Sequence, residues 1–103
     1  MAEPNENLLR KLEEIDEQFQ ILQTELLDPE VLSDHNKVRT LSIRRAAMEP
    51  IVDGFRGWTR TRAEISDLQQ MLESESDEDL RAMAREELPQ LEQQAADLLE
   101  QMQ

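Results

Sequence analysis

The sequence predicts an all-α fold, an elongated antiparallel three-helix bundle or coiled coil. Three long segments repeat apolar residues every three or four positions, which is the period of a helix that buries one stripe. Charged residues make up 34% of the chain and aromatic residues 3%, which is typical of narrow helical assemblies. Short connections between the segments indicate antiparallel neighbours. We therefore expect a single domain over residues 1–103, with helices over about 5–27, 34–74 and 77–103.

The first segment has the most regular repeat. Its apolar stripe steps alternately by four and three residues and consists of Leu8, Leu12, Ile15, Phe19, Leu22 and Leu26. Leu9 and Ile21 are expected to widen this stripe. The segment ends at the run LLDPEVLSD, where we expect Asp28 to cap a short turn that begins with Pro29.

The second segment begins near Ser33 or Asp34, both good helix caps. Its stripe consists of Val38, Leu41, Met48, Ile51, Phe55, Trp58, Ile65, Leu68 and Leu72. The register continues unbroken through the run MEPIVDGFRGW, so we interpret this run as helix and not as a loop. Pro50 lacks a backbone N–H, which predicts a bend or a local break.

Ile51, Phe55 and Trp58 are expected to point inward from this run. Core packing is the expected role of the two aromatic residues, which stand three positions apart on the apolar side. An exposed aromatic patch for a protein partner is the alternative.

The third segment follows the run SESDEDL, where Ser76 and Asp79 resemble a capping box. Its stripe consists of Leu80, Ala84, Leu88, Leu91, Ala95, Leu98 and Met102, flanked by Met83 and Leu99. Pro89 is expected to bend the helix. The pattern runs to Gln103 without a helix-stop signal, from which we expect the chain to be an N-terminal piece of a larger protein.

Residues that carry chemistry are scarce. The chain has no cysteine, and its one histidine, His35, stands beside acidic residues, as an ordinary surface histidine does. No nucleophile–base pair of serine or threonine with histidine is recognisable, and no glycine-rich phosphate loop occurs. We therefore expect no catalytic residue, no cofactor and no metal site, so that the chain is not an enzyme. No apolar run approaches the roughly 20 residues of a membrane span, which predicts a cytoplasmic protein without a membrane partner.

The charge pattern indicates one candidate contact surface. The chain has a net charge of −13, yet residues 33–72 carry seven bases and five acids. An acidic chain of this kind is not expected to bind free DNA. Helical spacing places Arg45, Arg56 and Arg60 on one flank, where they would meet an anionic partner. Arg44 and Arg62 lie beside the apolar stripe, within reach of acids on neighbouring helices. The alternative is that all five are ordinary surface or interhelix charges.

Four runs in the sequence resemble a known pattern: LLDPEVLSD, Leu41-Ser42, MEPIVDGFRGW and DEDLRAMAREEL. In this order and spacing they resemble the N-terminal domain of bacterial class-I peptide chain release factors, of the type that reads UAA and UAG. The resemblance extends from about Leu8 to Gln103.

The resemblance implies a role in translation termination. Full-length members read the stop codon with a Pro-x-Thr type tripeptide and promote peptidyl-tRNA hydrolysis with a Gly-Gly-Gln loop. This chain has neither, because its only glycines are Gly54 and Gly57 and no Pro-x-Thr occurs. The codon-reading and Gly-Gly-Gln domains are thus absent from it. The implied partners are the base of the large-subunit stalk of the ribosome, near ribosomal protein L11, and the class-II release-factor GTPase.

Two alternatives remain open from the sequence. The chain fits a free-standing coiled-coil adaptor or oligomeric scaffold. It also fits a fragment that associates with itself because a neighbouring domain is missing.

Overall fold

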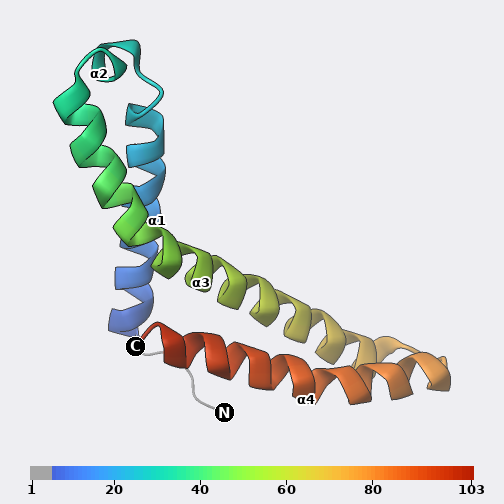
Figure 1. Cartoon of the computed structure of the whole chain (residues 1–103). Coiled ribbons are helices and arrows are strands. Elements are labelled where there is room, and N and C mark those ends of the chain that lie inside the picture. Colours follow the sequence, from blue (N-terminus) through green and yellow to red (C-terminus); the bar gives the residue numbers. More distant parts are fainter. Residues whose placement is uncertain (1–5) are drawn as a thin grey trace. The chain divides into compact units, whose positions relative to one another are not determined.

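The computed structural model describes residues 6–103 and contains four helices in that range (Figure 1). These are α1 (Glu6–Glu25), α2 (Pro29–Leu32), α3 (His35–Ser74) and α4 (Glu78–Gln101). No strand occurs in the described part of the chain, so the predicted all-α fold is confirmed.

Contacts divide the chain into two units, and the division falls inside α3, between Asp53 and Gly54. The first unit contains α1, α2 and the part of α3 up to Asp53, and we call it the α1 hairpin. The second contains the rest of α3 together with α4, and we call it the α4 hairpin. Within each hairpin the two long helical stretches run side by side in opposite directions (Figure 1).

In α1 the predicted stripe forms the buried side of the helix. Leu12, Phe19 and Leu22 are buried, and the remaining members are half-buried: Leu8, Ile15 and Leu26. Ile21 does not widen the stripe, because 52% of its surface is exposed. It precedes Leu22 by one residue, which turns its side chain about 100° away from the buried direction.

The connection between α1 and α3 is built from side-chain caps. Asp28 accepts a hydrogen bond from the Glu30 N–H (3.0 Å), and Pro29 is the first residue of α2, as predicted. Of the two candidate caps for α3, Asp34 takes this role, because its Oδ1 accepts hydrogen bonds from the N–H groups of Asn36 (3.1 Å) and Lys37 (3.2 Å). Such caps satisfy N–H groups that have no partner within the helix.

The run MEPIVDGFRGW lies inside α3, as the register predicts. The helix continues through Pro50, so the local break that was one expectation does not occur. The Pro50 side chain is exposed, which keeps its ring out of the packed side of the helix. Its missing N–H still leaves the carbonyl of Ala46 without a helical hydrogen bond at that position.

The buried stripe of α3 contains Val52 where the prediction had Ile51. Ile51 is 40% exposed, whereas Val52 is only 1% exposed, so the inward placement of Ile51 is wrong. A period of 3.6 residues lets either the third or the fourth residue before Phe55 share its face, and here the third does. Phe55 and Trp58 are each 8% exposed, and their stacked rings lie 6.3 Å apart, so their predicted core role is confirmed.

Three predictions for α4 are corrected. The helix cap is Asp77 and not Ser76, since the Asp77 Oδ1 accepts the Asp79 N–H at 2.9 Å. Leu80 is 41% exposed because it lies in the first turn of α4, at the end of the hairpin. Leu99, expected at the flank of the stripe, is 2% exposed and belongs to the core. The helix runs through Pro89 without a break.

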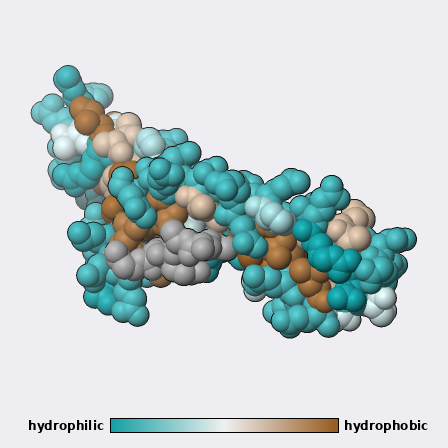
Figure 2. Space-filling model, turned by 90° about the horizontal axis from the view of Figure 1, so that it is seen from below, coloured by the Kyte–Doolittle hydropathy of each residue, from teal (hydrophilic) through white to brown (hydrophobic). Residues whose placement is uncertain are grey.

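The surface is largely hydrophilic, and apolar residues show on it in separate patches (Figure 2). Over residues 6–103, no helix is both long and apolar enough to span a membrane.

The burial of Val52 and the exposure of Ile51 can be tested by truncating each side chain. Val52→Ala is expected to lower the free energy of unfolding by about 2 kcal/mol, because it leaves a cavity in the core. Ile51→Ala serves as the matched control and is expected to change it by less than about 0.5 kcal/mol. Urea denaturation measures both values, and a larger loss for Ile51→Ala would contradict the structure.

A glycine of α3 offers a stabilising substitution. A Cβ added at Gly57 would lie 3.8 Å from the Leu98 Cδ1, an ordinary contact. Gly57→Ala is therefore expected to raise the free energy of unfolding by about 0.5–1 kcal/mol through helix propensity. At Gly54 the added Cβ would lie 3.4 Å from the Met102 Cγ, so Gly54→Ala is expected to gain less. Thermal unfolding compares the two, and the opposite order would count against this packing.

Candidate partner-binding surface

Arg45, the first of the three predicted contact arginines, lies in the α1 hairpin. Its guanidinium sits over the Phe19 ring, 5.3 Å from the ring centre, and pairs with the Glu49 carboxylate at 3.2 Å. The side chain is 37% exposed. Arg45 thus connects α3 to the buried face of α1 while its outer edge still meets solvent.

Arg56 and Arg60 lie in the α4 hairpin, on the second half of α3. Both are exposed, and their four-residue spacing places them on one face of the helix. The structure therefore brings these two together and assigns Arg45 to the other hairpin. Their role in binding an anionic partner stays a prediction.

The two arginines expected to connect the helices behave differently. Arg62 lies over the Trp58 ring, 5.6 Å from its centre, and covers that part of the core. Arg44 is exposed, and within residues 6–103 it makes no ion pair. Its side chain instead lines a hollow beside Ile21 and Leu22 of α1.

An ionic cluster at the start of α4 was not predicted from the sequence. Glu78 pairs with Arg85 at 2.6 Å and with Arg81 at 3.6 Å. The Arg85 guanidinium donates a hydrogen bond to the carboxylate and, together with the charge of Arg81, lowers the pKa of Glu78 below its ordinary value of 4.5. The spacing of three and seven residues was the signal in the sequence. The cluster holds a negative charge at the positive end of the helix, where it stabilises the first turn.

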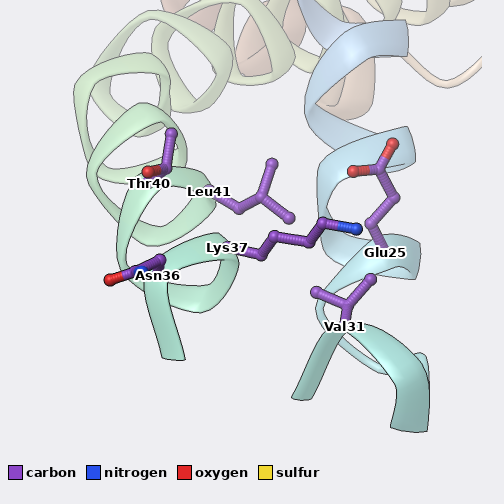
Figure 3. A pocket seen from close by; sticks show the side chains of 6 residues that line it. All are labelled: Glu25, Val31, Asn36, Lys37, Thr40 and Leu41. Atoms are coloured by element: carbon purple, nitrogen blue, oxygen red, sulfur yellow. The ribbon is translucent and has the colours of Figure 1, made fainter. Parts of the chain in front are cut away.

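A hollow of about 390 Å³ in the α1 hairpin was also not predicted. It is lined by Glu25 of α1, Val31 of α2 and four residues at the start of α3: Asn36, Lys37, Thr40 and Leu41. Lys37 and Leu41 point from α3 across the hollow, with Glu25 and Val31 on its other side (Figure 3). The pattern of a single segment could not predict this hollow, because residues of three helices line it and its volume depends on the distance between them.

Metal ligands are not gathered in the described part of the chain. Over residues 6–103 no group of three or more histidine, cysteine, aspartate or glutamate side chains is placed to hold a metal ion. His35 is the exposed first residue of α3.

Comparison with known proteins assigns the chain to a family. The sequence pattern of the PCRF domain matches residues 15–103. The chain belongs to the PCRF domain family. The resemblance to release factors read from its four sequence runs is thereby confirmed.

Relatives of this PCRF domain include several proteins named peptide chain release factor 1. The protein from Dehalococcoides mccartyi is 38% identical over 95 residues, which cover 92% of this chain and 27% of that protein. One from an Anaeromyxobacter species is 40% identical over 98 residues, covering 95% and 26%. One from Chlorobaculum tepidum is 35% identical over 96 residues, covering 86% and 27%. The chain thus spans about a quarter of the length of the curated relatives it matches. No solved structure matches it.

The ionic cluster predicts a pH response at the start of α4. Because the folded state lowers the pKa of Glu78, the cluster stabilises the fold at pH values above the ordinary 4.5, and this stabilisation is lost as the pH falls through the lowered value. Arg85→Ala is expected to return the pKa of Glu78 toward its ordinary value, whereas Arg10→Ala on α1 is expected to leave it unchanged. Titration of the side-chain carboxyl carbon by NMR measures both, and an equal pKa in the two variants would argue against the cluster.

Proposed function

We propose that this PCRF domain is a non-catalytic contact module of a translation termination factor. The observation that supports the proposal best is the similarity to proteins named peptide chain release factor 1, which extends over 86–95% of the chain. The full-length protein would recognise UAA and UAG stop codons on the ribosome and promote peptidyl-tRNA hydrolysis. This domain would contribute binding to that process and no reacting group.

The residues of the chain support a role without catalysis. Gly54 and Gly57 are its only glycines, and both lie inside α3, where helical backbone cannot form a catalytic loop. The exposed acids that belong to the ionic cluster or to helix caps are engaged in holding the helices. Peptide release would therefore depend on residues elsewhere in the full-length protein.

The proposed partners are the base of the large-subunit stalk, near ribosomal protein L11, and the class-II release-factor GTPase. Arg56 and Arg60 are the proposed contacts on the α4 hairpin, and the exposed edge of Arg45 is the contact on the α1 hairpin. With a net charge of −13, the chain is repelled by bulk nucleic acid, so these arginines would act in a small contact that the rest of the protein positions.

A domain exchange tests the proposal. This chain replaces the corresponding domain of a bacterial release factor 1, and peptide release is measured on purified ribosomes stalled at UAA. We expect the chimera to release peptide faster than a version that lacks the domain, and the isolated chain to release none. Release by the isolated chain would refute the non-catalytic role. A chimera no better than the deletion would refute the contact role.

The proposed contacts can be tested by charge reversal in the same chimera. Arg56→Glu with Arg60→Glu is expected to weaken ribosome binding by roughly tenfold at low salt and less at high salt, because screening reduces exposed charge interactions. Arg10→Glu with Lys11→Glu makes the same change in net charge on α1 and is the control. Co-sedimentation with ribosomes measures both, and equal losses in the two pairs would exclude a specific role for Arg56 and Arg60.

A further inference from the structure

Two of the hollows in the α1 hairpin follow one another along the seam between α1 and α3. The first is the hollow of about 390 Å³ beside α2, and the second measures about 250 Å³. Glu25 lines both. The second is lined by Gln18, Ile21, Leu22, Glu25 and Arg44. We call the two together the α1–α3 groove.

Helical spacing places the two hollows on the same side of the α1–α3 seam. On α3, Lys37 and Arg44 are seven residues apart, or two turns, so they lie on the same side of the helix. On α1, Gln18 and Glu25 have the same separation. Arg45, one residue beyond Arg44, turns toward the interface between α1 and α3, where it lies over the Phe19 ring.

The floor of the groove is apolar and not fully covered. Leu22 is buried, and Val31 and Leu41 are half-buried. Ile21 is 52% exposed at the edge of the second hollow. Within the α1 hairpin, α2 lines only the first hollow, and the exposed side chain of Ile21 leaves apolar surface in the groove for an incoming helix.

The wall formed by α3 carries positive charge that the described residues do not neutralise. Neither the Lys37 ammonium nor the Arg44 guanidinium forms an ion pair within residues 6–103. Lys37 extends from α3 toward Glu25 on the opposite wall (Figure 3). The two walls therefore differ in sign, with cations on α3 and a carboxylate on α1.

We propose that the α1–α3 groove binds an amphipathic α-helix of another protein. The apolar stripe of that helix would fill the two hollows, and acidic residues two turns apart along one edge would pair with Lys37 and Arg44. Lys37 and Arg44 themselves stand two turns apart on α3, which corresponds to about 10 Å along a helix. A nucleic acid fits less well, because the apolar floor offers nothing to phosphate and Glu25 repels it. The proposal stands on this geometry and does not rest on the role in translation.

Binding of designed peptides to the 103-residue chain tests the proposal. The probe is a fluorescein-labelled helical peptide of about 18 residues with a leucine stripe, glutamates two turns apart on one edge and lysines on the other. A comparison peptide carries lysine on both edges. It therefore presents no acidic edge to Lys37 and Arg44, whichever way round it lies in the groove. We expect the acidic-edge peptide to bind about tenfold more tightly, as measured by fluorescence anisotropy. Equal affinities, or no binding by either peptide, would overturn the proposal.

Matched pairs of variants test whether the peptide binds in the α1–α3 groove. Arg44→Glu and Ile21→Gln alter the groove, whereas Arg39→Glu and Ile43→Gln make the same changes on the far side of α3. All four positions are exposed, so the fold is retained. We expect each groove variant to weaken binding of the acidic-edge peptide by about tenfold and each control by less than about twofold. The same loss in both sets would overturn the assignment to the groove.

Two further measurements exclude other occupants. Sedimentation equilibrium of the chain alone is expected to give a monomer, and a dimer that Ile21→Gln dissociates and Ile43→Gln does not would assign the groove to a second copy instead. A short RNA hairpin is expected not to bind, and binding that Arg44→Glu abolishes and Arg39→Glu spares would assign it to nucleic acid. Either of these two results would overturn the proposal.

Discussion

In each hairpin, two packed helices bury only one stripe of each other's surface. The other features of the structure follow from this small buried area. The buried side chains among the described residues are accordingly few, and they include all three aromatic residues of the chain: Phe19, Phe55 and Trp58. Each buried apolar side chain contributes about 1.5–3 kcal/mol, so a small set of contacts offsets much of the ordering entropy. Thr61 is the one described polar side chain in this set, and its hydroxyl donates to the Gly57 carbonyl at 2.9 Å.

The small buried area also explains why so many polar groups act locally. Without a broad core, the ends of the helices are held by their own side chains, as the caps Asp28, Asp34 and Asp77 show. Two arginine side chains cover aromatic rings of the core: Arg45 lies over Phe19, and Arg62 lies over Trp58. A guanidinium suits this position because its flat face packs on a ring while its N–H groups remain in water. Charge in this protein is therefore part of the packing as well as of the surface.

Features that depend on the periodicity of one helix were predictable from the sequence, whereas features that depend on the packing of two helices were not. The stripe of α1 was correct because a regular repeat of four and three residues leaves one choice of buried face. At Phe55 the pattern allowed both Ile51 and Val52, and only the position of the partner helix selects between them. Leu80 has the right spacing, but its place near the end of the hairpin leaves it exposed. The hollow beside α2 was not predictable for the same reason, since its volume is set by the distance between α1 and α3.

The middle of α3 shows how these features act together. Pro50 contributes no helical N–H, and Gly54 and Gly57 have low helix propensity, so the local sequence favours helix weakly there. Yet Phe55 and Trp58 are buried in this same stretch. Its helical backbone is thus maintained by tertiary contact more than by local preference. We therefore expect helix and side-chain packing in this stretch to be lost together, so that destabilising substitutions in the core of the α4 hairpin also lower the helix content of α3.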